Sequence, residues 1–206
     1  MLVLVRHGQS HANAAGLLVG RADSPLTELG RRQAAAISNT LASSGSSSGC
    51  IFTSPLRRAA ETAQAIAGAV AAQGARVEVV VDDRFVELDY GELDGKAPSM
   101  LPASFWNTWR SDSSFRPRGG ETLLEVTERV SAALAEIVPQ AADRDVVVVS
   151  HVSPIKAAVA WALGTGPQLT WRLSLGVASI TRIAIDARHG PSLVSYNETA
   201  HLAMVA

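Results

Sequence analysis

Near its start the chain reads Leu2-Val3-Leu4-Val5-Arg6-His7-Gly8. Four consecutive Leu and Val residues are typical of a short strand that is buried on both faces of a sheet. An arginine and a histidine follow directly, so two chemically active side chains stand where this strand ends. In open α/β sheets, ligands bind beyond the carboxyl ends of the strands. We therefore expect a buried strand over residues 2–5 with a functional site beside its end.

Further strands are predicted by other apolar runs, and helices by apolar residues at helical spacing and by capping residues. We expect strands over 50–53, 76–81, 145–149, 177–185 and 192–196, and helices over 28–43, 54–73, 122–138 and 153–163. Strands that alternate with helices favour an α/β fold. The fold class we predict is a three-layer α/β/α sandwich around a mostly parallel central sheet.

The helix starts are predicted from particular residues. Thr27 can cap the first helix, and Ser54 can cap the second with Pro55 in its first turn, where a missing N–H costs nothing. Thr122 and Glu125 have the spacing of a capping box, which predicts the start of the third helix.

Three stretches are expected to be irregular. Residues 9–26 are polar and contain glycine, which indicates a loop, and the short Ser/Gly run 43–49 indicates another loop rather than a domain linker. Residues 96–120 hold three of the nine prolines and two of the four tryptophans. We predict that this last stretch is an excursion that covers the active site.

The composition excludes several classes of protein. At 206 residues and a formal net charge of −1, the chain suits one domain and has no general basic field that would favour nucleic acid. Cys50 is the only cysteine, so an internal disulfide and a multi-cysteine zinc site are excluded. The first residues are too short an apolar run for a signal peptide, and no stretch approaches about 18 apolar residues in a row. We expect a cytoplasmic protein without membrane contact; whether it forms a homodimer is left open.

The predicted topology brings charged side chains to one edge of the sheet if the strands are neighbours. Arg6 and His7 follow the first strand, Arg57-Arg58 follow the second, Glu87 lies beyond the third and His151 follows the fourth. Taken singly, each has an ordinary structural interpretation, such as a hydrogen-bonded strand-end histidine or a solvated helix charge. Their joint placement indicates a site for an anion.

These residue types suit the transfer of a phosphoryl group. A phosphate monoester carries close to two negative charges, and the planar guanidinium group can hold two of its oxygens at once. A neutral imidazole is a competent nucleophile without a metal ion. The leaving alkoxide needs a proton, for which Glu87 is the candidate general acid. From the residues alone, either His7 or His151 could be the nucleophile.

Several motifs in chain order resemble the histidine phosphatase superfamily, which includes the cofactor-dependent phosphoglycerate mutases. The matching stretches are Leu4-Val5-Arg6-His7-Gly8-Gln9-Ser10 with Asn13, Asp23-x-Pro25-Leu26-Thr27, Thr53-Ser54-Pro55-Leu56-Arg57-Arg58, Glu87-Leu88-Asp89-Tyr90-Gly91, Gly119-Gly120-Glu121-Thr122, Val149-Ser150-His151 and Asn197 to Leu202. The resemblance spans essentially the whole chain, residues 1–206, and implies a single phosphoglycerate mutase-like domain.

The resemblance also implies roles for the matching positions. His7 would be the nucleophile that becomes phosphohistidine, and Glu87 the proton donor. Arg6, Arg58 and His151 would complete the phosphate pocket, with Asn13 as an additional phosphate contact. In the register of the motif Arg58, and not Arg57, is the phosphate ligand. No cofactor is implied, and the substrate would be a small phosphorylated molecule.

Departures from the family pattern separate its branches. Val152 follows the second histidine where many relatives have glycine, a variant similar to bacterial acid phosphatase or α-ribazole phosphatase-like members. The mutases follow their glutamate with Arg-His-Tyr, whereas this chain has Leu88-Asp89-Tyr90 and a shorter excursion. We therefore predict a phosphatase, with a phosphoglycerate mutase-type phosphotransferase as the alternative. A catalytically silent module that binds a phosphorylated ligand is a third hypothesis, which the presence of every expected site residue disfavours.

Four basic side chains keep two interpretations each. Lys156 is either on a helix surface or a weak phosphate contact. Arg110, Arg116 and Arg118 are either solvated loop charges or contacts for a second acidic group of the substrate.

Two other chemistries are rejected. A cysteine phosphatase needs an arginine six residues after its cysteine, and Leu56 stands at that distance from Cys50. His7, His11, His151 and Asp23 contain metal-binding groups. We expect no metal there, because Arg6 and Arg58 would repel a cation.

Overall fold

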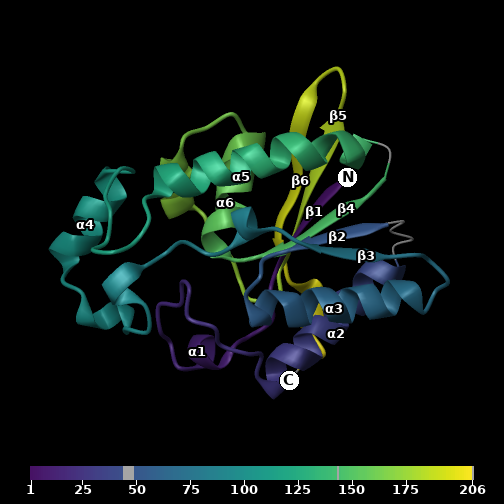
Figure 1. Cartoon of the computed structure of the whole chain (residues 1–206), viewed down its shortest axis with the longest axis horizontal. Coiled ribbons are helices and arrows are strands. Elements are labelled where there is room, and N and C mark those ends of the chain that lie inside the picture. The colour runs from purple at the N-terminus through teal and green to yellow at the C-terminus, as the bar shows by residue number, and fades with distance from the viewer. Residues whose placement is uncertain (44–48, 143, 206) are drawn as a thin grey trace.

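The centre of the protein is one sheet of six strands, in the order β3-β2-β4-β1-β5-β6. The computed structural model describes residues 1–43, 49–142 and 144–205 (Figure 1). The strands are β1 (Leu2–Arg6), β2 (Cys50–Thr53), β3 (Glu78–Val81), β4 (Val146–Ser150), β5 (Ile180–Asp186) and β6 (Gly190–Glu198). The first four are parallel, and β5 and β6 are antiparallel additions at one edge. The predicted mostly parallel sheet is confirmed.

Helices cover both faces of this sheet (Figure 1). On one side lie α2 (Glu28–Ser43) and α3 (Arg57–Ala71), and on the other α5 (Leu123–Ile137) and α6 (Val152–Ala162). Two shorter helices, α1 (His11–Ala14) and α4 (Ala103–Ser111), lie outside these layers. The predicted α/β/α sandwich is confirmed. Short 3-10 turns occur at Asp83–Phe85, Gly91–Leu93, Pro98–Met100, Val138–Ala142, Pro167–Arg172 and Ala200–Leu202.

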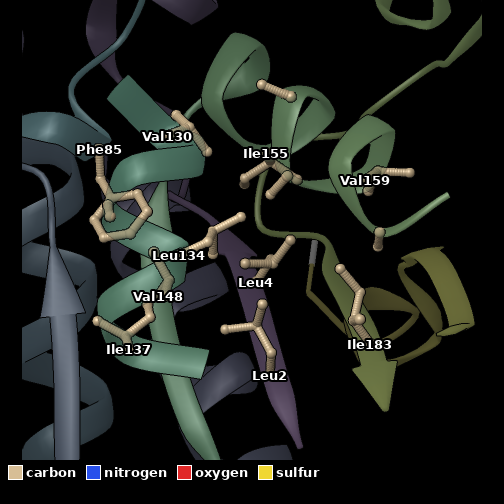
Figure 2. Packing of buried hydrophobic residues seen from close by; sticks show 14 of the residues in the cluster. Leu2, Leu4, Phe85, Val130, Leu134, Ile137, Val148, Ile155, Val159 and Ile183 are labelled. Atoms are coloured by element: carbon tan, nitrogen blue, oxygen red, sulfur yellow. The ribbon is translucent and has the colours of Figure 1, made fainter. Parts of the chain in front are cut away.

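Alternate side chains of β1 enter two separate cores, as expected for a strand that is buried on both faces. Val3 and Val5 pack in the cluster that contains residues of α2 and α3. Leu2 and Leu4 pack in the other cluster with Leu134 of α5 (Figure 2). Each of these four β1 side chains is at most 1% exposed. The two cores hold β1 in place on both faces, and its carboxyl end therefore has a well-defined position.

Two of the three predicted helix starts are confirmed. The Thr27 hydroxyl accepts a hydrogen bond from the backbone N–H of Gly30. Helix α2 begins at Glu28, directly after Thr27. Thr122 and Glu125 form the reciprocal capping box at the start of α5. Both signals depend on residues within one helical turn, so the sequence pattern was sufficient to locate them.

The predicted start of the second helix at Ser54 is wrong. Leu56 has extended backbone angles, and α3 begins at Arg57. The cap comes from a distant part of the chain, because the Asp23 carboxylate accepts a hydrogen bond of 2.8 Å from the backbone N–H of Arg57. The Ser54 hydroxyl accepts from the backbone N–H of Leu56 at 3.3 Å and also makes a side-chain contact, described below.

Two predicted irregular stretches contain helices. Within 9–26, Ser10 caps the short helix α1 and its hydroxyl accepts from the N–H of Asn13. Within 96–120, α4 forms from a segment whose aromatic side chains pack on one another and on the core. The third strand begins at Glu78, two residues later than predicted. The loop predicted over 43–49 lies mostly outside the described residues, which omit 44–48.

Within the described ranges, the helices are too short or too polar for any of them to cross a membrane.

Candidate active site

Three neighbouring parallel strands, β2, β4 and β1, end side by side and bring distant residues together. The pairing continues one residue past the strand ends. The N–H of His7 donates to the carbonyl oxygen of Ser150 at 3.1 Å, and the N–H of Ser54 donates to that of Val149 at 3.1 Å. His7, Ser54 and His151 are therefore held by backbone hydrogen bonds in adjacent positions. The convergence predicted for His7 and His151 is present.

His7 has the tautomer that a nucleophile needs. Its Nδ1 lies 2.7 Å from the carbonyl oxygen of Gly8. A carbonyl oxygen only accepts, so Nδ1 carries the hydrogen and Nε2 keeps its lone pair. Burial, together with the nearby guanidinium groups of Arg6 and Arg58, holds the pKa of His7 well below its ordinary value. The ring is therefore neutral at pH 7.

His151 is fully buried in the opposite tautomer, and its ring centroid lies 4.9 Å from that of His7. Its Nδ1 accepts a hydrogen bond of 3.2 Å from Nε of Arg58. Its Nε2 then carries the hydrogen, which it donates to the hydroxyl oxygen of Ser54 at 2.7 Å. Burial, His7 and the guanidinium of Arg58 lower the pKa of His151 well below its ordinary value. Sequence reasoning missed Ser54, which positions this ring instead of capping a helix.

Arg58 is the buried member of the arginine pair. It is 1% exposed, and its guanidinium donates to the carbonyl oxygens of Ala22 at 2.9 Å and of Gly20 at 2.8 Å. Burial lowers the pKa of Arg58, and the nearby Glu87 opposes that shift. Arg57 instead lies on the surface, where it pairs with Glu61. The structure thus places Arg58 at the site, as the motif register predicted.

The segment that holds Arg58 is itself anchored by a carboxylate. Asp94 accepts hydrogen bonds from the backbone N–H groups of Gly20 at 2.9 Å and Ala22 at 2.8 Å. A Cβ atom added at Gly20 would lie 2.5 Å from the carbonyl oxygen of Leu88, so only glycine fits. The hydrogen bonds to Asp94 position the carbonyl groups that orient Arg58, which sequence reasoning did not show.

Arg6 presents a donor without a partner. Its Nη1 donates to the carbonyl oxygen of Leu175 at 2.6 Å, which fixes the guanidinium. Within the part of the chain that the structure describes, its buried Nε has no hydrogen-bond partner. Burial lowers the pKa of Arg6, against the opposing effect of Glu87. A buried N–H without an acceptor is costly, and an oxygen of a bound anion would satisfy it.

Glu87 lies at the start of α6, next to His151. Its carboxylate oxygens accept from the backbone N–H groups of Leu88 at 2.8 Å, Val152 at 3.0 Å and Ser153 at 3.0 Å. The last two donors belong to the first turn of α6, whose N–H groups have no acceptor within the helix and therefore favour an anion. Only 4% of Glu87 is exposed. The structure therefore brings the predicted carboxylate to the same edge of the sheet.

The side chain of Asn13 forms local hydrogen bonds with one of its two polar groups. Its amide oxygen accepts from both the backbone N–H and the hydroxyl of Ser10, at 3.1 Å and 3.0 Å. Its amide NH2 group is the part that could donate to a phosphate oxygen. The predicted phosphate contact of Asn13 stays a prediction.

The four ambiguous basic side chains separate into different environments. Lys156 is half-buried, and its ammonium donates to the carbonyl oxygen of Thr170 at 3.0 Å, so it is not a free surface charge. Arg116 pairs with Glu125 and Arg118 with Glu92, both pairs being exposed. The guanidinium of Arg110 lies over the ring of Trp171, 5.8 Å from its centroid.

Fold and site together define a class of protein. Parallel strands in an α/β sandwich present an unprotonated imidazole nitrogen beside two guanidinium groups, of which that of Arg58 is buried, and a buried carboxylate. Such a site suits proteins that act on phosphate esters through histidine. The chain belongs to the histidine phosphatase superfamily (branch 1), whose family model matches residues 2–199.

Individual proteins and solved structures are also similar to this chain. Phosphoserine phosphatase 1 of Hydrogenobacter thermophilus is 32% identical over 205 residues, which cover 98% of this chain and 93% of that protein. A bifunctional protein of Mycobacterium tuberculosis is 35% identical over 205 residues, 98% of this chain, but the chain spans only 54% of its length. The solved structure of a mycobacterial glucosyl-3-phosphoglycerate phosphatase with VO3 is similar to this chain, with a TM-score of 0.85 and 29% sequence identity. The match covers 96% of this chain and 99% of that protein chain.

Proposed function

We propose that the protein is a phosphatase that hydrolyses phosphate monoesters through a phosphohistidine intermediate on His7. The observation that carries this proposal is the tautomer of His7, because the bond from Nδ1 to the Gly8 carbonyl leaves Nε2 unprotonated inside a pocket of positive charge. The phosphatase names of relatives that align over nearly the whole chain support it.

The phosphate pocket is assigned to four side chains. The unpaired Nε of Arg6 and the guanidinium of Arg58 oppose the charge of the phosphoryl oxygens. His151 lies against His7, held by Ser54 and Arg58. The amide of Asn13 is the fourth proposed donor. Because these groups are held before substrate binds, little reorganisation opposes the reaction.

The reaction proceeds in two balanced steps. Nε2 of His7 attacks phosphorus in line, the ester P–O bond breaks, and Glu87 gives a proton to the departing oxygen, which leaves as an alcohol. Water then attacks the phosphohistidine while Glu87 takes a proton. Phosphate leaves and the neutral histidine is restored.

A phosphatase and a mutase differ in what they release. With 3-phosphoglycerate as substrate, we expect the products to be inorganic phosphate and glycerate. With p-nitrophenyl phosphate, we expect that excess EDTA does not lower the rate, because the proposed phosphate ligands are side chains. Phosphate release and product composition are measured with and without chelator. Accumulation of 2-phosphoglycerate would support the mutase alternative. A rate that EDTA abolishes and added metal restores would overturn the mechanism.

Glu87→Gln should slow the hydrolysis of alkyl phosphates more than that of aryl phosphates, by roughly 10- to 100-fold in the ratio, because only a poor leaving group needs full protonation. The ratio is the informative quantity. Glutamine places an NH2 group against one of the N–H donors that now bind the carboxylate. The variant protein will therefore be less stable than the wild type, and this loss affects the assays of both substrate types equally. Glu92→Gln, at an exposed residue, is the control. An equal effect on both substrate types would mean that Glu87 is not the acid.

Three expectations from the sequence remain predictions: a single domain over residues 1–206, a cytoplasmic location and the absence of a nucleic-acid partner. Whether the protein forms a homodimer is still an open question.

A further inference from the structure

The orientation of one peptide group decides which tautomer His7 takes. The carbonyl oxygen that holds the Nδ1 hydrogen belongs to the peptide between Gly8 and Gln9. This peptide is trans, and in a planar trans peptide the N–H and the C=O point in opposite directions. While the C=O faces His7, the N–H of Gln9 therefore points away from the ring and needs an acceptor of its own.

Gln33 of α2 supplies that acceptor. Its side-chain oxygen Oε1 accepts a hydrogen bond of 2.8 Å from the N–H of Gln9. The residue is only 8% exposed. The acceptor has to be the amide oxygen, because the NH2 group of a glutamine only donates. A buried N–H that loses its acceptor is costly, so the contact with Gln33 favours the orientation in which the peptide offers its carbonyl group to His7.

The neighbouring contacts hold the backbone but still leave this peptide able to rotate. The N–H of Gly8 donates to the hydroxyl of Thr62 at 3.2 Å, which fixes the preceding peptide. A Cβ atom added at Gly8 would lie 2.4 Å from the carbonyl oxygen of Gly30, so only glycine fits. Glycine tolerates backbone angles that other residues avoid, and the peptide after it can turn over. The hydrogen bond to Gln33 opposes that rotation.

A reversed peptide would remove the nucleophile from the site. With the N–H of Gln9 toward the ring, Nδ1 of His7 would have to accept, and the hydrogen would move to Nε2. Nε2 would then have no lone pair with which to attack phosphorus. In the observed orientation, the bonds from Gln9 to Gln33 and from His7 to Gly8 lie in series across one peptide and strengthen each other. They support the positive charge that the ring acquires when Nε2 bonds to phosphorus.

We propose that Gln33 is a positioning residue for the nucleophile, because it holds the Gly8–Gln9 peptide so that His7 keeps its hydrogen on Nδ1 and its lone pair on Nε2. Gln33 acts through this peptide group and not by contact with the substrate. The expected effect on turnover rests on the proposed phosphatase function, whereas the expected effect on the tautomer does not.

The test removes the acceptor without changing the length of the side chain. Gln33→Met lacks the oxygen and should lower kcat for p-nitrophenyl phosphate by roughly 10- to 100-fold, the range for groups that orient metal-binding histidines from behind. KM should change little, because the proposed phosphate ligands are untouched. Gln33→Glu retains an acceptor at the same reach and should recover most of the loss. Gln64→Met, at an exposed glutamine of α3, is the matched control and should keep the wild-type rate.

NMR of protein with ¹⁵N-labelled histidines measures the tautomer without turnover. In the wild type we expect the hydrogen on Nδ1 of His7 and on Nε2 of His151, and His7→Ala assigns the signals of the two rings. Gln33→Met should shift His7 toward the form with hydrogen on Nε2, whereas Gln33→Glu should not. His151 is the internal reference, because a general loss of structure would alter both rings.

The outcomes separate the positioning role from the proposed function. A His7 tautomer that Gln33→Met leaves unchanged overturns the positioning role, even if the rate falls. A shifted tautomer in a protein that hydrolyses no phosphate ester supports the positioning role and overturns the proposed function. If Gln33→Met does not fold, Gln33→Asn, which withdraws the amide by one CH2 group, should show the same shift. Its absence there contradicts the proposal equally.

Discussion

His7→Ala should abolish turnover of every phosphate ester, with a loss of kcat by roughly 10⁴-fold or more. The reason is chemical, because the variant lacks the only nitrogen that forms the bond to phosphorus in the proposed mechanism. The wild-type protein, stopped in base after brief exposure to an activated ester, should carry an acid-labile phosphoryl group that the variant lacks. Mass spectrometry of the quenched protein would assign the group to His7.

The matched control is His189→Ala. His189 lies between β5 and β6, and its side chain is 84% exposed. It should retain the rate and the phosphoryl group of the wild type. A phosphoryl group on His151 in the wild type, or substantial turnover by His7→Ala, would reverse the roles that we assign to the two histidines.

Arg58→Ala should lower kcat/KM by roughly 10²- to 10³-fold, the range for loss of one group that stabilises developing charge. Arg57→Ala should change it by less than about threefold, because Arg57 is exposed and forms a surface ion pair with Glu61 across one helical turn. Steady-state kinetics with one aryl phosphate compares the two neighbours directly. Equal losses would mean that the phosphate ligand has been placed in the wrong register.

Arg58→Ala should also destabilise the fold, by about 2–4 kcal/mol, because it leaves buried acceptors unpaired. Those buried acceptors are the carbonyl oxygen of Gly20 and Nδ1 of His151, and the carbonyl oxygen of the exposed Ala22 also loses its donor. Arg58→Lys separates the two effects. It keeps the charge but cannot reproduce the planar fork that reaches all three acceptors. Thermal unfolding should rank wild type above lysine above alanine. A stability of Arg58→Ala equal to that of wild type would contradict the role of these contacts.

Much of the site was predictable because it lies at strand ends. His7, His151 and Arg58 follow β1, β4 and β2, and the apolar runs that predict those strands are local in sequence. The choice of His7 as nucleophile came from the family resemblance, and the hydrogen bond from its Nδ1 to Gly8 now supplies a structural reason.

Other parts of the site could not be predicted, because each depends on a partner far away in the chain. Ser54 was interpreted as a helix cap, yet its hydroxyl binds His151, 97 residues away. The true cap of α3 is Asp23, which lies 34 residues before the N–H that it accepts from. Lys156 is not a free charge on a helix surface, since its ammonium donates to the carbonyl oxygen of Thr170.

The sequence by itself determined the α/β/α sandwich, the burial of β1 on both faces and the residue types at the edge of the sheet. Apolar alternation and capping boxes act between residues a few positions apart, and a sequence displays such neighbours directly. Only the tertiary structure decided which tautomer each histidine takes, which donor of Arg6 remains unpaired among the described residues, and which acceptor the ammonium of Lys156 finds. Burial and hydrogen-bond satisfaction are properties of the packed chain, and they set charge and reactivity only after distant segments have met.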